Sequence, residues 1–125
     1  MKRTIFISGN TYYSNYYLFE AAMTKIIAEL DEKITPRFLL RGYRGVEKMA
    51  RRYARENYIE AKEEKPDWTN NNAGILKAQE ICKRSDMVVL FWDFDENKDL
   101  DAIVKYCEIT KKRLHIEVIQ SFAQI

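Results

Sequence analysis

Short apolar runs alternate along this chain with longer segments whose apolar residues recur at helical spacing. The runs lie at residues 4–8, 37–40, 87–92 and 114–119, with a weaker one at 59–61. Helical periodicity marks residues 19–30, 46–54, 73–84 and 100–107. Strands separated by such helices pair in parallel, through right-handed crossovers. The sequence therefore predicts an α/β fold, a Rossmann-like three-layer α/β/α sandwich with a mostly parallel five-stranded sheet.

Local signals refine this pattern. Met87–Trp92 is the most apolar run, which is typical of an inner strand covered on both faces. Ile59–Ala61 alternates with charged residues and indicates a strand near an edge. Pro36 interrupts the pattern, so the second strand is expected only after it. Ser14 or Asn15 is expected to cap the first helix.

Composition narrows the class of protein. The 21 basic and 19 acidic side chains leave a net charge of +2, too small for the positive field of a nucleic-acid binder. No apolar run is long enough to span a bilayer, and Ile5–Ile7 is too short for a signal peptide. We expect a soluble cytoplasmic protein with no membrane partner and a single domain, residues 1–125. Cys82 and Cys107 are expected to be buried, reduced thiols.

Turns that contain glycine follow the first two strands, at Gly9–Thr11 and Gly42–Gly45. The ligand crevice of an open parallel sheet lies beyond the carboxyl ends of its strands. Glycine allows close approach of backbone to ligand, and the N–H groups of the following helix attract phosphate. Arg44 adds donors for such an anion. Glycines needed only for tight turns explain the pattern equally well.

Six arginines crowd one segment of the chain: Arg37, Arg41, Arg44, Arg51, Arg52 and Arg55. A phosphate-bearing partner is one explanation of this cluster. Because Glu47 and Glu56 interleave with them, a solvated helix face is favoured for those that lie on the predicted helix.

Several motifs match a known superfamily in order along nearly the whole chain. They are G-N-T-Y-Y at 9–13, L-R-G-Y-R-G-V-E at 40–47, P-D-W at 66–68 and F-W-D at 91–93. With these motifs the chain resembles the SLOG superfamily, most closely its YspA-like branch, which is related to the LOG (lysine-decarboxylase-like) and DprA/Smf proteins. The resemblance implies a Rossmann-like fold with a nucleotide-type ligand at the strand ends.

The departures from the family pattern bear on phosphate binding. The family's first-turn arginine is Thr11 here, and one of its paired glycines is Arg41. Glu96 and Asp99 stand in place of a small turn, and unpaired carboxylates repel phosphate unless Lys98 or a metal offsets them. The P-G-G-x-G-T-x-x-E signature of LOG enzymes is absent, so their phosphoribohydrolase activity is not implied.

Other residue constellations are weak. His115, the only histidine, lies inside the predicted closing strand, which favours a structural or surface role over catalysis. The acidic stretch Asp93–Asp99 lacks the spacing of a calcium loop, so we expect a solvated loop, with no metal and no cofactor. Trp68 either stacks on a base or pins its loop to the core.

Binding of a nucleotide, nucleotide sugar or ADP-ribose-like molecule, with little or no catalysis, is the leading functional hypothesis. The expected ligand-binding residues are Gly9, Asn10, Thr11, Gly42, Tyr43, Arg44, Gly45, Trp68, Asp93 and Lys98. One alternative is an enzyme that cleaves or transfers N-glycosidic bonds, with Glu47 or Asp93 as its carboxylate. Another is a phage or mobile-element protein with a decayed pocket that binds a protein partner. A homodimer is compatible with each of these.

Overall fold

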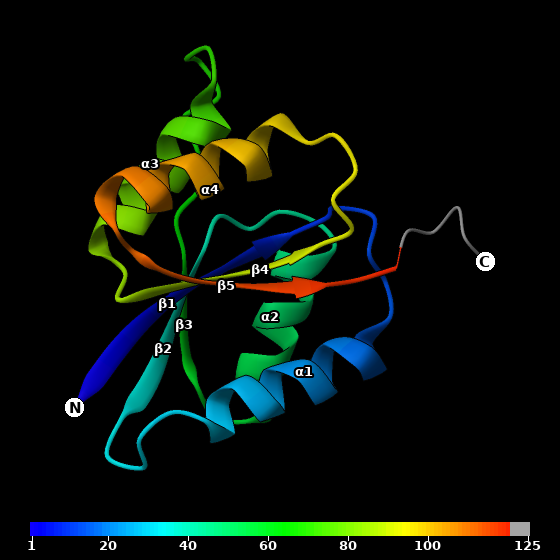
Figure 1. The fold of residues 1–125 in the computed structure, drawn as a ribbon, viewed down its shortest axis with the longest axis vertical. Helices are drawn as coiled ribbons and strands as arrows, with labels where there is room; N and C mark the ends of the chain where they lie inside the picture. The colour runs from blue at the N-terminus through cyan, green and yellow to red at the C-terminus, as the bar shows by residue number, and fades with distance from the viewer. Residues whose placement is uncertain (121–125) are drawn as a thin grey trace.

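A computed structural model describes residues 1–120, in which five strands alternate with four helices (Figure 1). The strands are β1 (Lys2–Gly9), β2 (Thr35–Leu40), β3 (Glu60–Glu63), β4 (Met87–Trp92) and β5 (Arg113–Val118). The helices are α1 (Tyr16–Ala28), α2 (Val46–Glu56), α3 (Ala73–Arg84) and α4 (Lys98–Thr110). The bounds predicted for α3 and β4 agree with the structure at both ends.

The five strands are all parallel and lie in the order β3-β2-β1-β4-β5. Figure 1 shows α1 and α2 on one face of the sheet, with α3 and α4 on the other. The predicted Rossmann-like three-layer sandwich is therefore confirmed. The connections change face between β1 and β4, so the switch point at which doubly wound proteins bind ligands lies beyond the carboxyl ends of these two strands.

The core consists of two apolar layers, one on each face of the sheet. Along β1, Ile5 and Ile7 pack into the layer of α1 and α2, whereas Phe6 packs into the layer of α3 and α4. Every residue of β4 is buried because helices cover both faces of this inner strand. The largely exposed β3 lies at the sheet edge, as its sequence predicts.

The second strand begins earlier than the sequence predicts. Pro36 lies inside β2, opposite Arg3 of β1. Proline has no N–H to donate and is excluded from strands that have partners on both sides. The outer neighbour β3 begins to pair only at Arg37, opposite Glu60. Pro36 therefore has no partner strand on that side, and its missing donor costs little.

Asparagine side chains cap two of the helices. Asn15 accepts a hydrogen bond from the backbone N–H of Leu18 at 3.2 Å, which confirms one of the two predicted caps of α1, and Asn97 caps α4 in the same way. Gly45 and Asn72, which precede α2 and α3, provide no side-chain cap. The backbone N–H groups at the N-termini of α2 and α3 thus lack the side-chain acceptor that those of α1 and α4 have.

The two cysteines and the apolar character of the helices were also considered in the sequence. Cys82 and Cys107 are free and buried, as expected. Within residues 1–120, none of the helices has both the length and the apolar character needed to cross a bilayer.

Candidate functional site at the carboxyl edge

The loops after β1 and β4 are tied together above the switch point by Asn10. Its side-chain oxygen accepts a hydrogen bond from the Asp93 backbone N–H at 3.0 Å, and its own N–H donates to the Phe91 carbonyl at 3.1 Å. The Asn10 carbonyl accepts from the Val46 N–H at 3.2 Å, at the start of α2. Asn10 is buried. Its polar groups therefore join three elements of the fold.

Two glycines permit this close approach of loops. Gly45 has a φ of +69°, and a Cβ there would lie 2.3 Å from the Asn10 carbonyl oxygen. A Cβ on Gly9 would lie 2.3 Å from the Phe91 carbonyl oxygen. Tight packing between the loops thus accounts for both glycines without a ligand.

Arg41, at the end of β2, is a fully buried cation with 0% of its side chain exposed. It donates through Nε to Glu47 at 3.0 Å, and through its terminal nitrogens to the Ser8 hydroxyl at 2.8 Å and the Gly74 carbonyl at 3.1 Å. The same nitrogens donate to both oxygens of Asp99, at 2.6 and 2.8 Å. One guanidinium therefore connects β1, α2, α3 and α4 to the end of β2.

The two carboxylates keep this buried guanidinium charged. Burial lowers the pKa of Arg41, but the hydrogen bond to Asp99 and the charges of Glu47 and Asp99 outweigh it and hold the pKa above its ordinary value. Glu47 also accepts from the Arg41 backbone N–H at 2.5 Å and from the Ser8 hydroxyl at 2.8 Å. The buried charges are thus compensated, as a low-dielectric interior requires.

Asp99 is not the unpaired acid that the sequence predicts. Because Asn97 caps α4, Lys98 and Asp99 lie in the first turn of the helix, not in a loop, and the Asp99 carboxylate pairs with Arg41. The two residues are 58 positions apart, so no local pattern reveals the pair. The Asp99 carboxylate is therefore paired with a cation and does not stand free against phosphate. The Arg41–Asp99 bridge instead fills the carboxyl edge on the side of α3 and α4.

Tyr43 and Trp68 stack beside Arg41. Their ring centroids lie 6.0 Å apart at an interplanar angle of 21°, and the guanidinium carbon of Arg41 lies 3.9 Å from the centroid of the Tyr43 ring. Tyr43 is thus enclosed between a cation and an indole, while Trp68 remains 67% exposed. The stack joins the loops after β2 and β3, which fits the pinning role considered for Trp68.

Arg44 differs from the arginines of the following helix. Arg51 and Arg52 form surface ion pairs with Glu63 and Glu56, as a solvated helix face predicts. Arg44 is exposed and has no ion-pair or hydrogen-bond partner among residues 1–120. Three more of the expected ligand-binding residues are also exposed at this edge: Thr11, Gly42 and Lys98.

The two candidate catalytic carboxylates are both engaged. Glu47 is buried in the Arg41 network. Asp93 accepts hydrogen bonds from the Tyr12 hydroxyl and from the Asp95 backbone N–H at 2.9 Å. Burial first, and then the contact with Asp93, raises the pKa of Tyr12 to about 12, so this phenol keeps its proton at neutral pH.

Other titratable groups do not add a reactive cluster. His115 lies within β5, where its Nε2 is 3.1 Å from a Glu117 carboxylate oxygen. In the part of the chain that the structure describes, no group of three or more His, Cys, Asp or Glu residues is placed to hold a metal ion.

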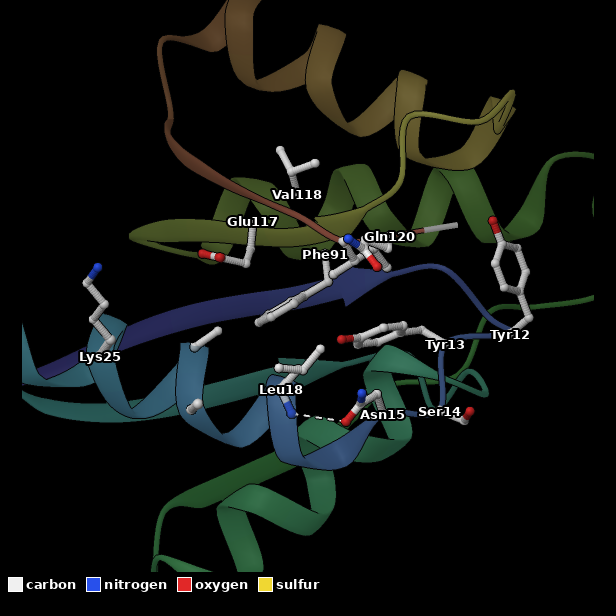
Figure 2. Close-up of a pocket in the computed structure, with 13 residues that line it drawn as sticks. Tyr12, Tyr13, Ser14, Asn15, Leu18, Lys25, Phe91, Glu117, Val118 and Gln120 are labelled. Carbon is white, nitrogen blue, oxygen red and sulfur yellow. Dashed lines mark hydrogen bonds between the residues drawn. The ribbon is translucent and has the colours of Figure 1, made fainter. Parts of the chain in front are cut away.

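A cavity of about 890 Å³ opens at the carboxyl ends of β4 and β5, on the face that carries α1 (Figure 2). Leu114 and Ile116 of β5 pack into the α3 and α4 layer, so the alternate residues, including Glu117, face the α1 side. The other walls are α1 and the loop segment Tyr12–Asn15, with Phe91 at the floor. This volume is typical of small-molecule sites, about 300–1,000 Å³.

This cavity was not predicted from the sequence. Tyr12 and Tyr13 belong to a quoted motif, but Lys25 fits the polar side of an amphipathic helix and Glu117 fits the polar side of a strand. The polar alternation of the last strand was the available signal, since it indicates a face left without a helix.

Comparisons with protein-family models, with curated proteins and with solved structures found no significant match to this chain. The resemblance to the SLOG superfamily therefore stays a prediction.

We expect Arg41→Met to lower the free energy of unfolding by about 3–5 kcal/mol, because it leaves Glu47 buried without its cation. Asp99→Asn should cost less, since the Asp99 side chain is 27% exposed and water can replace part of the pair. Arg41→Met combined with Glu47→Leu should recover part of the loss. Urea unfolding measures all three variants. A loss below about 1 kcal/mol for Arg41→Met would contradict the network.

Proposed function

We propose that this protein binds a nucleotide-type ligand at the carboxyl edge of its sheet and does not cleave it. The observation that carries the proposal is the cavity of about 890 Å³ beside the switch point. Its wall includes Tyr12–Asn15, from the loop after β1, the position at which doubly wound proteins hold nucleotides. Aromatic and aliphatic side chains with a few polar groups suit a flat ring with polar edges.

The α3 and α4 side of the same edge offers less room. Arg41 and Asp99 occupy it with an internal ion pair, and Tyr43 closes over the guanidinium. A ligand that entered there would have to displace a charge-assisted pair that is largely desolvated. The ring of the ligand is therefore assigned to the α1 side.

Arg44 is the proposed phosphate contact. It precedes Gly45, whose hypothetical Cβ would lie 2.6 Å from the Thr11 carbonyl oxygen, and Thr11 adjoins Tyr12 in the cavity wall. Arg44 is thus separated from the cavity wall only by Gly45 and the adjoining backbone of Thr11. The start of α2 has no side-chain cap and adds a favourable dipole for an anion.

The state of the carboxylates favours binding over cleavage. Glycosidic hydrolysis needs carboxylates free to act at the sugar. Glu47 is saturated by Arg41 and Ser8, and Asp93 accepts from Tyr12 and Asp95. A nucleotide-type ligand is also what the resemblance to the SLOG superfamily implies.

Filling the cavity should abolish binding. Nucleoside monophosphates at millimolar concentration should raise the melting temperature, as any ligand that binds only the folded state does. Ala21→Trp introduces a large ring at an exposed position of the cavity wall, so this rise should disappear while the variant stays folded. Ala28→Trp, at the exposed end of α1 outside the cavity, is the matched control. Stabilisation that persists in Ala21→Trp would place the ligand elsewhere.

Arg44→Ala should weaken phosphate recognition selectively. Loss of one charge-assisted hydrogen bond, about 1.5–3 kcal/mol, should raise the Kd of a nucleoside monophosphate about ten- to a hundredfold and leave the nucleoside unaffected. Calorimetric titration measures both ligands. The melting temperature should stay unchanged because Arg44 has no partner among residues 1–120. Arg51→Ala and Arg52→Ala are the controls; equal losses in these variants would identify the helix face as the binding surface.

A further inference from the structure

Two oppositely charged side chains line the same end of the cavity without pairing with each other. Lys25 projects from α1 and Glu117 from β5 (Figure 2). Among residues 1–120, Lys25 has no ion-pair partner, and the one ion-pair contact of the Glu117 carboxylate is the 3.1 Å contact with His115 Nε2. Glu117 therefore keeps accepting capacity and Lys25 keeps its donors.

The part of the cavity beside these charges is aromatic. The Phe91 ring lies at the floor, and the Tyr13 ring enters from the loop after β1 with its hydroxyl directed inward (Figure 2). Burial, and then the charge of Glu117, raises the pKa of Tyr13, so its hydroxyl remains a donor at neutral pH. A flat ring thus meets aromatic surface on its face, and a carboxylate acceptor and an ammonium donor at one edge.

Each nucleobase offers a different edge to such a pair. Guanine carries two adjacent donors, N1–H and the 2-amino group, beside the acceptor O6. A carboxylate accepts from two donors at once, and an ammonium donates to a carbonyl oxygen. Adenine presents a ring nitrogen beside its amino group. This nitrogen is an acceptor, so a carboxylate repels it. The net charge of the Lys25 and Glu117 pair is zero, which suits a neutral ring.

Resting on the proposed function, we infer that the base held in this cavity is guanine. Glu117 accepts from N1–H and the 2-amino group, Lys25 donates to O6, and the ring packs on Phe91 and Tyr13. These four residues make the cavity a guanine-selective subsite.

Calorimetric titration of the full chain at pH 7 with GMP, IMP and AMP tests this selectivity. GMP should bind at least about tenfold more tightly than AMP, because each charge-assisted hydrogen bond changes affinity about ten- to a hundredfold. IMP lacks the 2-amino group and should bind more weakly than GMP. Equal affinities for GMP and AMP, or tighter binding of AMP, would overturn the guanine assignment and leave nucleotide binding intact. Failure of all three to bind would overturn the proposed function as well.

Matched variants test the two residues. Glu117→Gln should weaken GMP about ten- to a hundredfold and leave AMP nearly unchanged, since AMP lacks the donor pair. Lys25→Met should weaken GMP and IMP alike, because both carry O6. Glu108→Gln and Lys83→Met, exposed residues outside the cavity lining, are the controls. A preference for GMP that survives both Glu117→Gln and Lys25→Met would place the base elsewhere and overturn the inference.

Discussion

The rest of the carboxyl edge depends on the buried charge of Arg41. A guanidinium with no exposed surface is tolerated only where every donor is matched, and here Ser8, Glu47, Gly74 and Asp99 supply the acceptors. These acceptors come from β1, α2, α3 and α4, so a single side chain sets how the helices meet the strand ends. Loss of the guanidinium would leave Glu47 buried without its cation, whereas loss of the Asp99 carboxylate would leave Arg41 paired with Glu47.

The network also demands a small residue in α3. A Cβ on Gly74 would lie 2.0 Å from the Tyr43 hydroxyl and 3.8 Å from an Arg41 nitrogen. Gly74 is the second residue of α3, outside the helix interior in which glycine costs about 1 kcal/mol relative to alanine. Glycine is favoured at this position because Tyr43 packs over the guanidinium and because the Gly74 carbonyl accepts a hydrogen bond from Arg41. The residue at position 74 of α3 is thus determined by the packing of Tyr43 and by the buried charge of Arg41.

The sidedness of the proposed site follows from this network. On the face of α3 and α4, the carboxyl edge is filled by the protein's own ion pair. On the face of α1, the outer strand β5 leaves a cavity that Glu117 and Lys25 help to line. The same topology therefore supplies a closed side and an open side. The ligand is assigned to the open side because it offers volume, aromatic surface and polar groups that are not saturated.

Local physics in the sequence predicted most of the fold. Helical periodicity gave both ends of α3, the continuous apolar run gave both ends of β4, and Asn15 was identified as a cap. The prediction that β2 begins only after Pro36 was wrong, because a proline is tolerated in a strand according to where the neighbouring strand begins to pair. Contacts between distant residues, such as Arg41 with Asp99, leave no periodic trace, because they arise only after the strands have been ordered into a sheet. The cavity was missed because Lys25 and Glu117 fit the polar sides of a helix and of a strand.

Hydrogen–deuterium exchange with and without GMP tests most directly the claim that the ligand binds on the α1 side. Binding should slow exchange in segments 12–25 and 117–120, which contain most of the cavity lining, while residues 66–74 near the Tyr43 and Trp68 stack should change little. Slower exchange confined to residues 41–45 and 66–74, with none in α1 or at the end of β5, would contradict the assignment.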